Sequence, residues 1–197
     1  MSNKKDLQSE ITRRKLVGIA RTLFAQRGYE AIGTEEIVHE AKVTRGALYH
    51  HYRNKLELFA AVVDAVMKEM HDGLVAAAAG TDLWRSLELG VEAFLDQGSQ
   101  EEFLRILFRD GPSVLGWARW REMDARYGMG LLQKLLEAAM AQKIIAVQPI
   151  KPLTHLLLGA LTEASLMIGN SEDPTTTRRE LRVTFRSLLD GLRMSPK

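Results

Sequence analysis

The chain of 197 residues contains no cysteine, which excludes disulfide bonds and thiolate chemistry and fits a protein of the cytoplasm. No stretch reaches the roughly 20 consecutive apolar residues that a membrane span needs. The polar start MSNKKDLQSE has no apolar segment of the kind that marks a secretory signal. No alternation of apolar and polar residues persists either, so strands are not expected. These absences leave an all-α protein of the cytoplasm.

The motifs of the common enzyme classes are also missing. The chain has no HExxH, no P-loop and no GxSxG. Gly128-Met-Gly130 follows no predicted strand, so it is not a dinucleotide loop. The five histidines are scattered, and the adjacent pair His50 and His51 would diverge by about 100° on a helix, which prevents them from sharing an ion easily. We therefore expect no enzyme, no metal and no cofactor.

Positive charge is concentrated at the front of the chain. The formal net charge is only +2, but residues 1–56 hold eleven Lys or Arg against six acids, which leaves a mildly acidic remainder. A basic front on an acidic body is typical of a nucleic-acid-binding module joined to a second domain. We place the boundary at residue 56, with a DNA-binding domain at 1–56 and a ligand-binding and dimerisation domain at 57–197.

Apolar residues recur with the helical period along almost the whole chain. About nine helices are expected, in an N-terminal three-helix unit followed by a C-terminal helical bundle. Beyond the first helix, which ends at Gly28, two short helices are predicted, one that begins at Thr34 and carries Ala41 and one that begins at Thr44 and holds Ala47 and Leu48. The longer predicted stretches are 55–79, 82–96, 101–109, 113–142, 152–169 and 175–190. Thr34 and Thr44 are expected as N-caps of the second and third helices.

Residues 34–55 have the parts of a helix-turn-helix. Ile37, Ala41, Val43 and Leu48 form a small apolar seam between two short helices. The second of them opens with Thr44, Arg45 and Gly46, and its first turn is the part that enters the major groove in such motifs. Arg45 can donate a bidentate pair of hydrogen bonds to guanine. Gly46 lets the backbone approach closely.

Residues 12–60 resemble the N-terminal domain of TetR-type (tetracycline-repressor-like) regulators. The resemblance runs from LFAQRGYEAIGTEEI through TRGALYHHYRNK to the ELF that opens the connecting helix. It implies a dimer that places one recognition helix in each half of a near-palindromic operator on double-stranded DNA. Together with the residue chemistry it gives the expected DNA contacts Thr34, Lys42, Thr44, Arg45, Gly46, Tyr49, His50 and Lys55.

Lys42 departs from the family pattern, which has glycine at the turn between the two helices. A lysine in the left-handed conformation would cost about 1–2 kcal/mol. Either the turn differs slightly, or a phosphate contact offsets the cost. Val38 and Leu56 are two further departures, inside the seam and at the start of the connecting helix.

Large adaptable side chains cluster in the middle of the body. They form either core or the wall of a pocket between helices, where bundles commonly bind ligands. The second interpretation predicts an apolar or aromatic inducer. It also includes two acids, Asp110 and Glu163, which would favour a ligand with a cation or a hydrogen-bond donor if both faced the cavity. The predicted pocket residues are Phe94, Phe103, Leu107, Asp110, Trp117, Trp120, Met123, Tyr127 and Glu163. The run at 104–128 also resembles, more loosely, the ligand domains of a subgroup of the same regulators.

The last two predicted helices are amphipathic and are expected to form an intersubunit four-helix bundle about a two-fold axis. The expected interface residues are Leu156, Gly159, Ala160, Met167, Leu181, Phe185 and Leu188. Alternatively, both helices cover only their own subunit's core.

The sequence thus favours a ligand-responsive transcriptional regulator, a repressor released from DNA by a small molecule. A second hypothesis is a DNA-binding protein whose helical body recruits a protein partner. A third, an α-helical enzyme, would need a convergent set of catalytic groups, which the sequence does not show.

Overall fold

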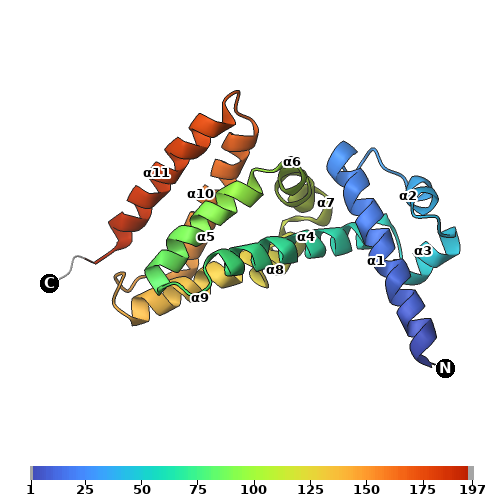
Figure 1. The fold of residues 1–197 in the computed structure, drawn as a ribbon, viewed down its shortest axis with the longest axis horizontal. Coiled ribbons are helices and arrows are strands. Elements are labelled where there is room, and N and C mark those ends of the chain that lie inside the picture. Colours follow the sequence, from blue (N-terminus) through green and yellow to red (C-terminus); the bar gives the residue numbers. More distant parts are fainter. Residues whose placement is uncertain (1, 195–197) are drawn as a thin grey trace. The chain divides into compact units, whose positions relative to one another are not determined.

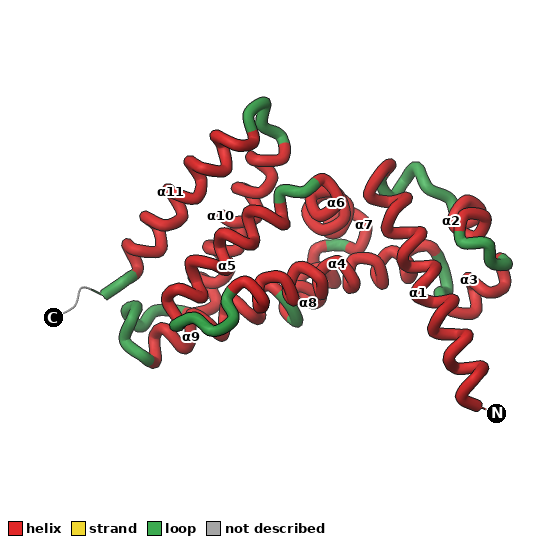
Figure 2. Tube along the Cα trace, in the orientation of Figure 1, coloured by secondary structure: helices red, strands yellow, loops and turns green. Residues whose placement is uncertain are grey.

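The computed structural model describes residues 2–194, with side chains from Asp6 onward. Lys4 and Lys5, which contribute to the basic front, therefore lie outside the described side chains, as do residues 1 and 195–197. Within the described part, the chain consists of helices joined by short loops, and no strand is present (Figure 2). The all-α fold class is confirmed.

The chain divides into two compact units. The first unit contains residues 1–66 and, in addition, 105–120; the second contains 67–104 and 121–197. We call the first the head unit and the second the body unit. The long helix α4 (Lys55–Ala77) contributes residues to both (Figure 1).

The head unit is built on three helices: α1 (Ser2–Arg27), α2 (Thr34–Glu40) and α3 (Arg45–His51). Its core contains the predicted seam residues Ile37, Ala41 and Leu48, all fully buried. Phe24 packs edge-on against Phe59 of α4, with ring centroids 5.3 Å apart. The apolar period along these segments therefore fixes how the three helices pack.

The segment 105–120 carries irregular helical structure. The short helix α6 (Glu101–Phe103) leads into a π-helix, η1 (Leu104–Asp110), which is followed by α7 (Gly111–Leu115). Gly111 fits closely here, because a Cβ on it would lie 2.9 Å from the Trp120 ring. Gly116 then adopts a φ of 78° and ends the helix.

The body unit packs four helices together: α5 (Leu83–Gly98), α9 (Gly128–Ala141), α10 (Ile150–Gly169) and α11 (Pro174–Leu192). Helix α10 contacts each of the other three. Asp82 and Asp173 cap α5 and α11 through their side chains. The expected helix at 152–169 is therefore the centre of this unit.

The single helix predicted at 113–142 is wrong. The structure has three helices there, α7, α8 (Trp117–Ala125) and α9. Gly116 breaks the first junction through its left-handed backbone. At the second junction a Cβ on Gly130 would meet the Ala125 carbonyl oxygen at 2.3 Å, so the chain turns where only glycine fits.

In the turn between α2 and α3, Lys42 has a φ of 48°, so of the two possibilities left open by the sequence the left-handed turn is the one present. The backbone therefore keeps the left-handed turn that the family pattern fills with glycine. The Thr34 prediction is wrong in one detail: Gly33 is the N-cap and Thr34 is the first helical residue. Thr44, by contrast, caps α3 as expected, since its Oγ1 accepts a hydrogen bond from the Ala47 amide at 3.1 Å.

We predict that Lys42→Gly stabilises the head unit by about 1 kcal/mol, because glycine adopts a positive φ without the clash of a Cβ. Urea unfolding followed by circular dichroism measures the change in the midpoint. Lys15→Gly, inside the exposed face of α1, is the matched control and should lose about 0.5–1 kcal/mol. Equal destabilisation by both variants would contradict the assignment of strain to Lys42.

Candidate DNA-binding surface and ligand cavity

Helix α3 presents its first turn at the surface of the head unit. Thr44, Arg45 and Gly46 are exposed, whereas Leu48 on the opposite face is fully buried. The threonine cap and the buried leucine hold the helix from two sides. The side chains that the sequence predicts to read DNA are therefore on an accessible and well-supported helix.

Arg45 has a partner in the free protein. Its Nη1 lies 2.9 Å from Glu35 Oε1 on α2, and both side chains are about two-thirds exposed. The guanidinium also lies over the Tyr49 ring, 5.5 Å from its centroid. An exposed ion pair of this kind contributes little to stability, so Arg45 can exchange Glu35 for another hydrogen-bond acceptor at small cost.

The neighbouring aromatic residues divide between surface and core. Tyr49 is 40% exposed and His50 is exposed, as a phosphate contact requires. Tyr52 is buried, and burial raises the pKa of its hydroxyl. Partial burial and the nearby His50 lower the pKa of His51, which keeps that imidazole neutral at pH 7.

Lys55 lies at the start of α4, where the sequence places a phosphate contact. Its ammonium is 3.9 Å from the centroid of the Tyr29 ring, and partial burial lowers its pKa. The lysine is thus half-buried on an aromatic ring. Two supporting groups were not predicted from the sequence. Glu35 pairs with Arg45. Asn54 caps α4, since its Oδ1 accepts a hydrogen bond from the Glu57 amide.

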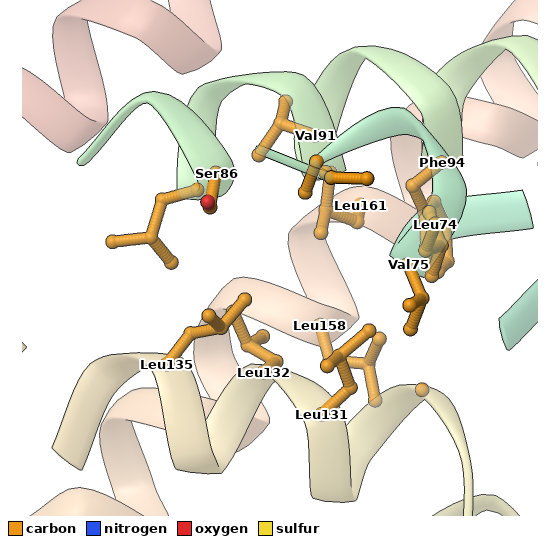
Figure 3. A pocket seen from close by; sticks show the side chains of 15 residues that line it. Leu74, Val75, Ser86, Val91, Phe94, Leu131, Leu132, Leu135, Leu158 and Leu161 are labelled. Carbon is orange, nitrogen blue, oxygen red and sulfur yellow. The ribbon is translucent and has the colours of Figure 1, made fainter. Parts of the chain in front are cut away.

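A cavity of about 310 Å³ lies inside the body unit. Figure 3 shows leucines of α9 on one side, residues of α5 on the other, and α10 behind them. The end of α4 completes the wall with Leu74 and Val75, followed by Ala78 and Ala79. Leu158 and Leu161 of α10 form its floor.

The lining is almost wholly aliphatic. Among the lining residues that the structure describes, Ser86 has a polar side chain and the others are apolar. Its hydroxyl lies 2.8 Å from the Asp82 carbonyl oxygen and 2.9 Å from the Thr81 hydroxyl, so it is already hydrogen-bonded within the protein. A charged ligand would lose its hydration here without gaining a partner.

Most of the predicted pocket residues lie elsewhere, and Phe94 is the one that lines this cavity. Phe103, Leu107, Trp120 and Met123 are buried in the packing of the chain. Trp117 is 61% exposed and stacks on Trp120 at 5.3 Å. Tyr127 is half-buried and contacts the His71 ring edge-on.

The two predicted acids do not face the cavity together. Asp110 accepts a hydrogen bond from the Tyr29 amide at 2.8 Å, inside the head unit, and Glu163 is exposed on α10. The condition for a cationic ligand is therefore not met at this cavity. Large aromatic side chains occur in protein cores as well as in pockets, so their clustering in the sequence does not distinguish the two.

The exposed face of α10 and α11 carries part of the predicted dimer interface. Leu156, Met167 and Leu188 are 73%, 49% and 50% exposed in the single chain, and Gly159 is exposed between the first two. Ala160 and Leu181 are half-buried. Phe185, at 3% exposure, packs in this chain's own core instead and is not available to a partner.

Metal-binding clusters and membrane-spanning helices are both absent from the part of the chain that the structure describes. No group of three or more His, Cys, Asp or Glu side chains is placed to hold a metal ion. No helix there is both long and apolar enough to cross a membrane.

The structure thus defines a helix-turn-helix protein with a helical body unit that carries an apolar, partly open cavity. The chain belongs to the TetR family. Residues 16–62 match the family model described as bacterial regulatory proteins of the tetR family, and residues 84–192 match the tetracyclin repressor-like C-terminal domain. It is a TetR-family transcriptional regulator.

Relatives with similar length support the same assignment. The Tn10 TetC protein of Escherichia coli is 25% identical over 195 residues, which cover 98% of this chain and 99% of that protein. A TetR-family regulator of known structure from Pectobacterium atrosepticum is 31% identical, with a TM-score of 0.78, covering 97% of this chain and 98% of that one. RolR, solved with resorcinol, has the same fold at 17% identity, with a TM-score of 0.70 and 95% and 90% coverage.

Proposed function

We propose that this chain is a repressor that binds a near-palindromic operator as a dimer and is released by an uncharged, apolar small molecule. The DNA contacts are Thr34, Lys42, Thr44, Arg45, Gly46, Tyr49, His50 and Lys55. The ligand site is the cavity in the body unit. The observation that carries the proposal is the exposed first turn of α3 in a chain whose body holds an aliphatic cavity.

The electrostatics of the head unit support binding to DNA. Arg45 and Lys42 are exposed beside the amino end of α3, where a phosphate or a base edge would also meet the end of the helix. In the free protein the Arg45 guanidinium pairs with the Glu35 carboxylate, and on the operator it would instead donate two hydrogen bonds to a guanine. Sequence-specific binding then replaces an exposed ion pair with two directed hydrogen bonds.

Exposed apolar residues on α10 and α11 support the proposed dimer. Leu156 and Met167 are separated by three helical turns on one face of α10, with Gly159 between them allowing close approach. The same face repeated by a two-fold axis buries these side chains against their copies. Two recognition helices about 34–36 Å apart then meet successive major grooves.

The cavity favours a small-molecule ligand over a recruited protein partner. Its volume of about 310 Å³ accommodates roughly 10 to 15 non-hydrogen atoms at the packing density of protein interiors. The presence of resorcinol in RolR, a protein of the same fold, is consistent with a small uncharged ligand. A ligand that fits only one conformation of the body shifts the population away from the one that binds DNA.

The test uses decanol, decanoate and decylammonium, which share one chain length and differ in charge. We expect decanol to raise the melting temperature of the protein and to weaken its binding to a duplex that the protein selects from random-sequence DNA. The two ions should do neither, because the cavity offers no group to pair with their charge. Sedimentation should give a dimer; a monomer, or stabilisation by decanoate equal to that by decanol, would contradict the proposal.

A further inference from the structure

The backbone passes between the two units at three places: within α4 after Val66, before Arg105 and after Trp120. The segment 105–120 thus belongs to the head unit, although the chain on either side of it belongs to the body unit. A structural change in the body therefore reaches the head through α4 and through both ends of this segment.

One end of the segment holds the carboxyl end of α1. The Asp110 carboxylate accepts a hydrogen bond from the Tyr29 amide at 2.8 Å, and Arg105 Nη1 donates to the Gln26 carbonyl oxygen at 3.2 Å. The Gln26 carbonyl oxygen lies in the last turn of α1, where carbonyl groups lack partners within the helix, and the Tyr29 amide follows the end of that helix. Gly28 turns the chain there with a φ of 81°. The segment therefore supplies the polar contacts of this helix end.

The other end of the segment holds the first turn of α4. Arg119 donates from Nη1 and Nη2 to the two carboxylate oxygens of Glu57, both at 3.1 Å. This pairing lowers the pKa of Glu57. A bidentate pair fixes orientation as well as distance. Glu57 is two residues after Lys55, a proposed phosphate contact.

The two attachments meet at Tyr29. Its amide is held by Asp110, while its ring lies under the Lys55 ammonium and packs on Phe59 of α4 at 4.9 Å. A displacement of the segment would therefore move the end of α1 and the start of α4 together. These two elements flank α2 and α3 in the chain.

Stability alone does not account for the pair of Arg119 and Glu57. Their side chains are 38% and 41% exposed, and ion pairs in water of this kind contribute little to folding. The π-helix η1, which ends at Asp110, is a second unusual feature, since π-helical turns are rare and are frequently found at functional sites. Conversion of a π-turn to an α-turn rotates the residues after it by about 100° relative to those before it, which would break the contacts of Arg105 and Asp110 as a set.

We propose that Arg105, Asp110 and Arg119 are positioning residues for operator binding. Their contacts hold the end of α1 and the start of α4 against the segment 105–120, so that the helical register of this segment sets the position of the recognition helix. The inference rests on the proposed function, because position is meaningful only if two heads must fit one operator.

The experiment measures how strictly the protein requires the half-site spacing. The reference duplex is the one that the wild-type chain selects from random-sequence DNA, and two further duplexes move its half-sites apart by one and two base pairs, about 3.4 Å each. The variants are Asp110→Ala, Arg119→Ala and their combination. Asp110→Asn keeps an acceptor oxygen for the Tyr29 amide, and Arg85→Ala removes an arginine whose side chain pairs with Glu88 on its own helix in the body unit.

We expect the combined variant to bind the reference duplex about 10-fold more weakly, equivalent to about 1.4 kcal/mol. Its loss of affinity on the altered spacings should shrink by about 10-fold or more, since a released head adapts to a displaced half-site. Asp110→Asn and Arg85→Ala should keep the wild-type spacing penalty. Hydrogen exchange at the Tyr29 amide should accelerate in Asp110→Ala and stay slow in Asp110→Asn.

An unchanged spacing penalty in a folded combined variant would overturn the inference while leaving the proposed function intact. If that variant does not fold, Arg119→Lys decides, because it keeps the charge at an exposed site and loses the bidentate geometry; a wild-type penalty in this variant likewise overturns the inference. A wild-type chain that selects no duplex would contradict the proposed function itself, and the inference with it.

Discussion

Arg45→Ala is expected to lower the affinity of the dimer for its selected duplex by about 100-fold or more. A bidentate arginine–guanine pair contributes roughly 1–3 kcal/mol of discrimination, and the dimer makes it once in each half-site. The substitution costs the free protein little, because Arg45 is two-thirds exposed and its ion pair is with a similarly exposed Glu35. Fluorescence anisotropy with a labelled duplex at fixed salt measures the loss.

Arg45→Lys is the informative control for this prediction. It keeps the positive charge but not the planar fork that matches guanine O6 and N7. We expect both variants to lose base preference at one position of each half-site, and the lysine variant to retain more of the affinity for random duplexes. Arg45→Ala with wild-type affinity and wild-type base preference would show that Arg45 does not read the operator.

The second large effect is expected at Gly90, where one substitution should stabilise the body unit and abolish its response to decanol. Gly90 lies inside α5 and lines the cavity, and a Cβ added there would have nothing within 4 Å. Leucine at this position gains helix propensity and buries apolar surface in space that is now empty. We expect Gly90→Leu to gain about 1–3 kcal/mol, a rise of several degrees in melting temperature.

The same leucine occupies part of the space that a ligand needs, so decanol should no longer raise the melting temperature of Gly90→Leu. Gly18→Leu is a matched control, because Gly18 lies inside α1, also with nothing within 4 Å of an added Cβ, and far along the chain from the cavity. That control should keep the response to decanol. A Gly90→Leu protein that still responds would place the decanol site elsewhere.

Much of the head unit could be predicted from the sequence because its determinants are local. The capping Thr44, the buried Leu48 and the exposed Arg45 follow from helical period and capping chemistry within a few residues. At Lys42 the sequence left two possibilities open, and the φ of 48° shows which of them the turn adopts. The error at Thr34 is a shift of one residue in a helix start, where Gly33 forms the cap.

The cavity could not be located in the same way. Its walls come from the end of α4 and from α5, α9 and α10, whose leucines and valines look like any core residues. Trp117 and Asp110 drew attention because they are large or charged beside a helix break, yet one is exposed and the other contacts the Tyr29 amide. Residue type shows that a side chain is apolar; packing decides whether the space beside it is filled.

The sequence by itself determined that the chain is helical, that it carries a helix-turn-helix at 34–55, and that the family is TetR, since periodicity, caps and motif spacing are properties of neighbouring residues. Only the tertiary structure decided where the cavity lies, that Phe185 is core, and that residues 105–120 belong with the head. Those features depend on contacts such as that between Asp110 and Tyr29, 81 residues apart, and pairing over that separation leaves no local pattern in the chain.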